Sequence, residues 1–184
     1  MTCLVRKYAA RARAFARDLI RRDDGATAVE FAFVIGPFLF MLFATLELAL
    51  VFSVSVMLEN ATADAARRIR TGELQTAGGA TKTTFRNDIC AHMPWMETQC
   101  RERLQIDVRT YQQWADAQPV DPIQNGKLDD KALMFDAGKA GSIVLVRAYY
   151  RWPLLTPFLN QALARLDGGV AVIQSTATFR NEPY

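Results

Sequence analysis

The chain has 184 residues, of which 51% are hydrophobic and 22% charged, with 22 Lys and Arg against 19 Asp and Glu. This composition excludes a disordered tail, a collagen and a low-complexity array, and the length fits one ordinary domain. The basic excess is concentrated at one end rather than spread over a folded face, so we expect no nucleic-acid partner.

Charge divides the sequence into three segments. Residues 1–24 contain seven basic and three acidic residues and so carry a net charge of +4. Residues 25–58 contain only Glu30 and Glu47 as charged residues, and residues 59–184 contain 15 basic and 14 acidic residues. We therefore predict a basic leader, an almost uncharged middle and a balanced C-terminal part.

The uncharged middle is long enough to cross a membrane. Between Phe31 and Leu58 the only charged residue is Glu47. A helix of this length would reach about 42 Å, against a hydrocarbon core of about 30 Å. The stretch exceeds the apolar core of a removable secretory signal, so we predict a single transmembrane helix. Because the basic residues precede it, the positive-inside rule places the leader in the cytoplasm and the C-terminal part across the membrane. The leader is either a basic amphipathic helix on anionic membrane lipid or a solvated segment.

Three features inside the apolar stretch require a physical explanation. Gly36 and Pro37 place a helix breaker in it, which predicts a kink. Glu30 stands at its start, where the carboxylate is either solvated at the interface or paired. Glu47 stands in its middle, where an ionised carboxylate costs about 2.5–3.5 kcal/mol. For Glu47 we favour a polar partner on another subunit over a protonated acid that faces lipid.

The pattern after the apolar stretch predicts an α+β fold. The helix continues with one apolar face to about Thr71–Gly72, where glycine favours termination. Residues 104–109 alternate as a half-exposed strand should, and residues 143–152 and 170–179 predict two further strands. We therefore expect a long N-terminal helix packed on a small, mainly antiparallel β-sheet head with short helices.

Short helices and loops fill the rest of the predicted head. A linker rich in Thr and Gly at residues 75–84 precedes a short helix that Pro94 ends. Residues 112–141 form a long connection with a short helix near 129–135, and another short helix runs from Thr156 to about Leu166. The predicted parts are a leader at 1–25, a transmembrane helix at 26–58, its continuation at 59–74 and a head at 75–184.

Two cysteines agree with this topology. Cys90 and Cys100 lie in the predicted extracytoplasmic head with nine residues between them. In an oxidising compartment they would form a loop-closing disulfide that contributes about 2–3 kcal/mol. The alternative is two unpaired buried thiols. Cys3 lies in the leader, on the reducing side of the membrane.

No arrangement of residues indicates catalysis or metal binding. His92 is the only histidine in the chain, so neither a Ser-His-Asp arrangement nor a Cys/His metal cluster has enough members. The residues Arg147, Tyr149, Arg151 and Trp152 would form either a recognition strip or, as we favour, a cation-π edge. We expect a protein that is not an enzyme and that uses no metal and no cofactor.

One motif indicates a family. The run from Gly25 to Phe31 reads Gly-Ala-Thr-Ala-Val-Glu-Phe. Preceded by a basic leader and followed by an apolar helix with a proline, it resembles the class III signal of type IV pilins. More narrowly, it resembles the TadE-like pseudopilins of the tight-adherence (Tad, or Flp) pilus system. The resemblance extends to residues 65–68, to Gly72 and to the C-terminal residues 179–184.

The resemblance implies processing and assembly. A prepilin peptidase would cut between Gly25 and Ala26, and Glu30 with Phe31 would set the register between subunits. In that register the Glu30 carboxylate would meet the new ammonium of Ala26 in a neighbouring subunit, since an unpaired buried charge is costly. The implied partners are the prepilin peptidase, a companion pseudopilin, the major pilin and the inner-membrane assembly platform.

From these observations we expect a minor pilin or pseudopilin of the bacterial inner membrane. It would pass the membrane once, with its N-terminus cytoplasmic and its head periplasmic, and take part in assembly of an adhesive pilus through helix packing. The alternative is a bitopic, membrane-anchored binding domain that is neither processed nor polymerised.

Overall fold

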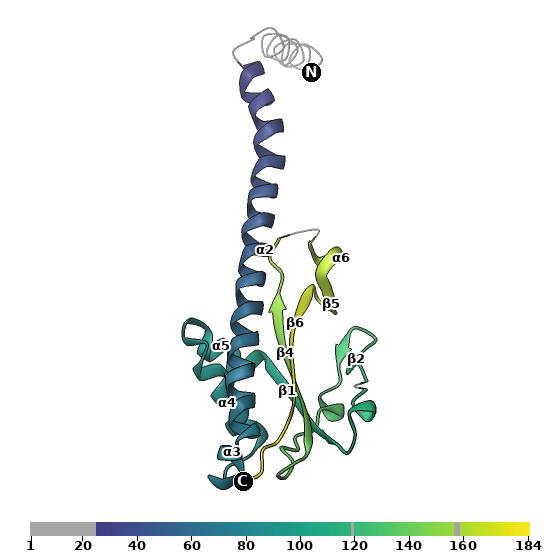
Figure 1. The fold of residues 1–184 in the computed structure, drawn as a ribbon. Helices are drawn as coiled ribbons and strands as arrows, with labels where there is room; N and C mark the ends of the chain where they lie inside the picture. The colour runs from purple at the N-terminus through teal and green to yellow at the C-terminus, as the bar shows by residue number, and fades with distance from the viewer. Residues whose placement is uncertain (1–24, 119, 157–158) are drawn as a thin grey trace, which may run out of the picture. The chain divides into compact units, whose positions relative to one another are not determined.

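The computed structural model describes residues 25–118, 120–156 and 159–184, and the predicted leader, with Cys3, lies outside them. One long helix, α2 (Ala26–Arg70), opens the described chain, and a four-stranded sheet with short helices follows it (Figure 1). The chain separates into two compact units, residues 1–43 and 44–184. The predicted α+β class, with a long N-terminal helix, a mainly antiparallel sheet and short helices, is confirmed.

α2 ends where the sequence predicts. Arg67, Arg68 and Arg70 occupy its last turn, where positive charge interacts favourably with the helix dipole. Gly72 then adopts a φ of +76°, a left-handed conformation that glycine reaches without strain. A side chain would not fit at this position, because a Cβ on Gly72 would lie 2.3 Å from the ring of Tyr184.

Three long strands and one short strand form the main sheet. β1 (Leu104–Tyr111), β4 (Ile143–Pro153), β6 (Val170–Arg180) and β5 (Ala164–Leu166) lie in the order β1-β4-β6-β5, and each neighbouring pair is antiparallel. The register pairs Leu104 with Tyr150 and Ile143 with Arg180. The three predicted strands are thus present, each one or two residues longer than predicted.

The core lies between α2 and one face of this sheet. The helix face that the spacing predicts is buried, with Leu58, Ala65 and Ile69 at 0% exposure and Ala61 at 1%. β1 and β4 contribute alternate side chains to the same cluster: Leu104, Ile106, Val108, Val144, Val146, Ala148 and Tyr150. Burial of this apolar surface stabilises the head by about 25 cal/mol for each Å² removed from water.

Four short helices connect α2 with β1: α3 (Glu73–Thr76), α4 (Lys82–Ala91), η2 (Pro94–Met96) and α5 (Glu97–Arg103). α4 begins inside the predicted linker, because Thr81 and Thr84 form a capping box at its N-terminus. It ends at Ala91, and Pro94 begins η2 instead of ending α4. α3 and α5 are too short to produce a periodic pattern, and the sequence did not predict them.

The long connection between β1 and β4 carries a small hairpin of β2 (Ile123–Gln124) and β3 (Lys127–Leu128), between η3 (Trp114–Asp116) and η4 (Asp130–Ala132). The helix predicted near 129–135 is wrong beyond η4. There the backbone runs along β1 instead, since Val108 exchanges hydrogen bonds of 2.9 Å with Met134 and Asp136.

The helix predicted from Thr156 to about Leu166 is also shorter in the structure. α6 covers only Leu159–Leu163, and residues 157–158 lie outside the described chain. The residues that follow α6 form β5, because Ala164 pairs with Ala171 of β6. Strand pairing with β6 therefore replaces the last helical turn that the sequence predicted.

Candidate functional site

The start of α2 holds the residues that the sequence associates with processing and assembly. α2 begins at Ala26 and Gly25 before it has 3-10 conformation, so the predicted cleavage bond joins Gly25 to the first residue of α2. A Cβ on Gly25 would meet no heavy atom within 4 Å. Glu30 is exposed and Phe31 is 63% exposed. Within the described part of the chain, no hydrogen bond or ion pair reaches Glu30.

Apolar side chains cover the first part of α2, residues 26–43; residues 44–70 are its second part. Ten large hydrophobic residues between Val29 and Phe43 are 37–77% exposed. Such a surface is unfavourable in water, and the helix is long and apolar enough to cross a membrane. α2 continues as a helix through Pro37, and the kink expected at Gly36–Pro37 stays a prediction.

Glu47 is only 6% exposed, although it stands in the apolar stretch of the sequence. Its Oε1 accepts a hydrogen bond from the backbone N–H of Leu155 at 2.6 Å, and its Oε2 accepts one from Thr156 at 2.7 Å. The carboxylate thereby satisfies two backbone donors from the segment that follows β4. We expected the partner of Glu47 on another subunit, whereas the structure supplies it from the same chain.

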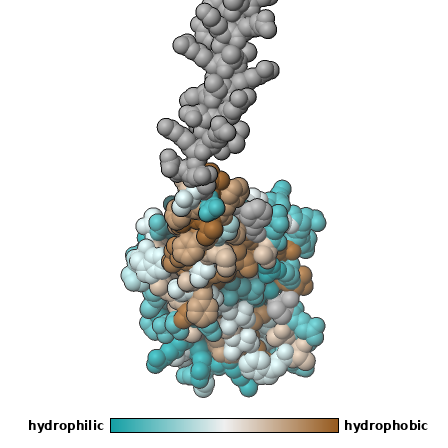
Figure 2. All heavy atoms as spheres, turned by 90° about the horizontal axis from the view of Figure 1, so that it is seen from above, coloured by the Kyte–Doolittle hydropathy of each residue, from teal (hydrophilic) through white to brown (hydrophobic). Residues whose placement is uncertain are grey.

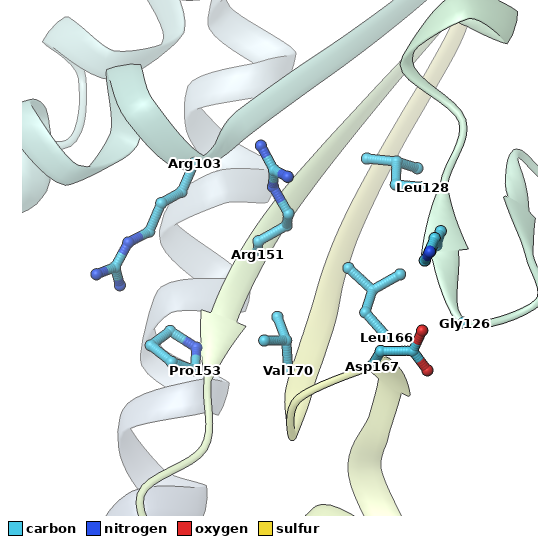
Figure 3. A pocket seen from close by; sticks show the side chains of 9 residues that line it. Arg103, Gly126, Leu128, Arg151, Pro153, Leu166, Asp167 and Val170 are labelled. Atoms are coloured by element: carbon cyan, nitrogen blue, oxygen red, sulfur yellow. The ribbon is translucent and has the colours of Figure 1, made fainter.

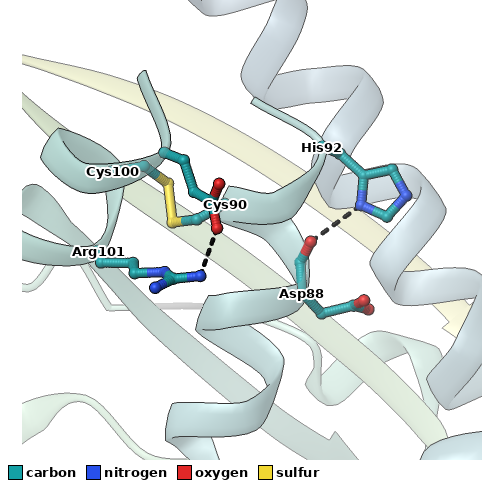
Figure 4. The surroundings of a disulfide bond; sticks show 6 residues. Asp88, Cys90, His92, Cys100 and Arg101 are labelled. Atoms are coloured by element: carbon teal, nitrogen blue, oxygen red, sulfur yellow. Dashed lines mark hydrogen bonds and ion pairs between the residues drawn. A yellow bond between two sulfur atoms is a disulfide. The ribbon is translucent and has the colours of Figure 1, made fainter. Parts of the chain in front are cut away.

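Cys90 and Cys100 form a disulfide that joins α4 to α5 (Figure 4). Their Cα atoms are 5.5 Å apart, and both residues are fully buried. Beside the disulfide, Nδ1 of His92 donates a hydrogen bond of 2.9 Å to the carbonyl oxygen of Asp88. Among the residues that the structure describes, no group of three or more His, Cys, Asp and Glu side chains is placed to hold a metal ion.

A buried charge cluster ties the second face of the sheet to the long connection. Asp107 is fully buried, and Nη2 of Arg147 lies 2.5 Å from its carboxylate. The same carboxylate accepts hydrogen bonds from Nε of Arg109 at 2.9 Å and from the backbone N–H of Met134 at 2.8 Å. The alternation of β1 predicted a half-exposed strand, which is wrong for Asp107 because the long connection covers it.

The cation-π edge expected on β4 is present at one pair. The guanidinium carbon of Arg147 lies 5.7 Å from the ring centroid of Tyr149, and both residues are buried. Burial raises the pKa of the Tyr149 phenol, and the positive charge of Arg147 opposes that shift. This pair is therefore part of the interior of the head rather than a recognition strip on its surface.

A pocket of about 490 Å³ lies at the end of β4 (Figure 3). Three cationic residues line it, Arg103, Lys127 and Arg151, together with one acid, Asp167. The excess of positive charge favours an anionic group over a cationic one. The pocket was missed from the sequence because its residues come from five separate elements, α5, β3, β4, β5 and β6, and no short motif joins them.

Two further features were missed by sequence reasoning. The donors to Glu47 are backbone amides, which carry no signal in the residue types at positions 155 and 156. The pairing of Asp107 with Arg147 joins residues 40 positions apart. A charged residue in the middle of each of two adjacent strands was the only available indication of it.

A long helix with an exposed apolar first part, followed in the chain by a folded α+β head, fits a single-pass membrane protein. Residues 25–67 match the family model described as TadE-like protein. The match begins at Gly25 and confirms the resemblance inferred from the sequence. The matched residues are Gly25 and most of α2. No curated protein and no solved structure matches the chain.

Proposed function

We propose that the protein is a minor pilin or pseudopilin that takes part in assembly of a Tad-type adhesive pilus. The observation that carries this proposal is the exposed carboxylate of Glu30 on an otherwise uncharged apolar helix surface. From Ala26 to Leu46, Glu30 is the only charged residue. A lone carboxylate at the edge of hydrocarbon is tolerable when a neighbouring cation pairs with it.

Processing of the leader supplies that cation. Cleavage between Gly25 and Ala26 by a prepilin peptidase removes the net charge of +4 from residues 1–24 and creates an ammonium on Ala26. Two copies of α2, or α2 and the helix of a companion pseudopilin, then pack with an axial offset that brings Glu30 of one chain to Ala26 of the next. The exposed apolar residues on the same helix, such as Phe31 and Phe33, provide the packing surface.

The protein acts in this proposal by packing and not by catalysis. Its N-terminus lies in the cytoplasm and its head in the periplasm, where the Cys90–Cys100 disulfide forms. The proposed partners are the prepilin peptidase, a companion pseudopilin, the major pilin and the inner-membrane assembly platform.

The test replaces Glu30 by Gln in cells that assemble the pilus. The amide keeps the shape of the side chain but removes its charge, so we expect normal membrane insertion and normal cleavage. Recovery of the variant with its partner subunits after crosslinking should fall several-fold. The matched control is Glu59→Gln, which removes an exposed carboxylate further along α2 and should leave recovery unchanged. Normal incorporation of the Glu30 variant would contradict the register proposed here.

The second candidate function is an anchored binding domain that keeps its leader. The cationic pocket with Arg103, Lys127 and Arg151 favours it, because a fibre subunit needs no ligand site. The intact mass of the protein from cells with and without the prepilin peptidase separates the two functions. Loss of residues 1–25 only when the peptidase is present supports the pilin, and a full-length chain in both cells supports the anchored domain.

A further inference from the structure

The segment after β4 has one exposed apolar side chain, and hydrogen bonds to Glu47 fix its backbone. Leu154 is 9% exposed, whereas Leu155 is 84% exposed. The N–H groups of Leu155 and Thr156 both donate to the carboxylate of Glu47. This pairing fixes the orientation of the segment, which we call the interfacial loop (residues 154–156). An outward leucine is unfavourable in water, since burial of such a side chain contributes about 1.5–3 kcal/mol.

The exposed leucine is not isolated, because α2 is apolar beside it. Around Glu47, the residues Leu46, Leu48 and Phe52 are 52%, 44% and 70% exposed. Figure 2 shows that hydrophobic and hydrophilic residues both occupy the face seen from above. Exposed apolar side chains that gather at one level of a helix indicate a partner surface or a membrane contact.

The positions around the helix distinguish lipid from a single protein partner. Successive residues of an α-helix are rotated by about 100°, so Leu46 and Leu48 lie on nearly opposite sides of α2. The head covers the side of Glu47, Val54 and Leu58, all of them buried. One partner helix would cover one stripe only, whereas hydrocarbon covers every remaining side.

The length of α2 places Glu47 at the edge of a bilayer. The helix begins at Ala26, and the residues from there to Leu46 rise by about 32 Å at 1.5 Å per residue, which matches a hydrocarbon core of about 30 Å. The carboxylate and the two amides that it binds then lie at the boundary with the headgroups. There polar groups are tolerated better than in mid-membrane.

We propose that the interfacial loop enters the outer edge of the bilayer beside α2, with Leu155 as its hydrophobic anchor and Glu47 as the clamp that orients it. The occupant of this surface is membrane lipid. The head thereby has a second membrane contact besides α2. The hydrogen bonds between Glu47 and the loop set the depth of this contact relative to α2. The proposal requires α2 to span a membrane, but it does not require cleavage of the leader or assembly of a pilus.

The test measures the depth of Leu155 in the full-length protein, reconstituted in vesicles of phosphatidylethanolamine and phosphatidylglycerol. A nitroxide spin label is attached at Leu155→Cys in a Cys3→Ser background, and its collisions with oxygen, which enters lipid, and with a nickel chelate, which stays in water, are compared. The matched control is Val120→Cys, because Val120 is 70% exposed on the long connection.

We expect the ratio of oxygen to nickel collisions to be several-fold higher at position 155 than at position 120. Equal ratios at the two positions would place the loop in water and overturn the proposal. Exclusion of both reagents at position 155, together with dipolar broadening between labels, would show that a second copy covers the loop, and would overturn it equally.

The role of Glu47 is tested with Glu47→Ala in the same labelled proteins. Loss of the carboxylate frees both amides, so nickel collisions at position 155 should rise towards the value at position 120. The value at position 120 should stay constant, which shows that the head is still folded. An unchanged ratio at position 155 would refute the clamp. If this variant does not fold, the depth measured with Glu47 intact still decides the lipid contact.

The reconstituted vesicles contain no pilus component. A failure of this experiment therefore leaves the proposed function standing, and a failure of the proposed function leaves the lipid contact standing.

Discussion

The first and second parts of α2 are both apolar, yet their side chains have different surroundings. Phe33 is 77% exposed and Met41 68%, whereas Leu58 and Ile69 are completely buried. The second part is covered because β1 and β4 present alternate apolar residues to it. Apolar side chains make a helix surface unfavourable in water. The rest of the chain decides whether protein buries that surface.

The acidic residues of the two parts differ in the same way. Within the described residues Glu30 has no partner, while Glu47 binds two backbone amides. A carboxylate with protein donors is part of the fold, and one without them is available to something outside the chain. Removal of a group should therefore affect the stability of the head only where the head supplies its partners.

The largest effect should come from the charge cluster of the head. Asp107→Ala leaves the buried guanidinium of Arg147 uncompensated, and we expect the free energy of unfolding of the head to fall by about 3–5 kcal/mol. Denaturant titration of the detergent-solubilised protein, followed by tryptophan fluorescence, measures this change. Glu30→Gln, in the first part of α2, should change the same quantity by less than about 0.5 kcal/mol.

A double variant separates the effect of the buried charges from the effect of side-chain volume. Asp107→Leu with Arg147→Met replaces the buried ion pair by apolar side chains and should recover part of the lost stability, because the backbone N–H of Met134 still loses its acceptor. If the single Asp107 variant is as stable as the wild type, the buried pairing seen here does not hold the sheet to the long connection.

The next effect tests the two helix surfaces directly. Leu58→Ala removes a side chain that is fully buried, so we expect a loss of about 2–5 kcal/mol from lost contacts and the cavity left behind. Leu42→Ala makes the same chemical change where the leucine is 42% exposed, and it should leave the stability of the head within about 0.5 kcal/mol. Equal losses of stability at the two positions would mean that burial of the leucine side chain does not decide its contribution to the head.

Sequence reasoning predicted the elements that leave a periodic signal. The end of α2 near Gly72 and the three long strands were predicted because helical spacing, glycine and β-branched residues act locally. The match of residues 25–67 agrees with the motif that starts at Gly25.

The remaining features depend on contacts between distant segments. β5 forms because it pairs with β6, and Glu47 is satisfied by amides 108 and 109 positions away. Asp107 reads as a half-exposed strand residue until the long connection is placed over it. Local propensity carries no information about which segment arrives at a given surface, so these parts could not be predicted from residue types alone.

The smallest of the three effects concerns the disulfide. Replacement of Cys90 and Cys100 by Ala should lower the free energy of unfolding by about 2–3 kcal/mol, because the unfolded chain regains the freedom of the closed loop. Alanine avoids a buried hydroxyl at two fully buried positions.

Reductant added to the wild-type protein provides the decisive comparison. Reduction opens the same loop but keeps both sulfur atoms in place, so a loss equal to that of the double Ala variant assigns the effect to loop closure. A loss seen only in the variant would assign it to side-chain packing instead. Cys3→Ser is the control, since it removes a thiol from the leader and should leave the denaturation midpoint unchanged. Neither treatment should alter membrane insertion of the first part of α2. That part contains neither cysteine of the disulfide. If membrane insertion is lost together with the stability of the head, the two parts of α2 depend on each other.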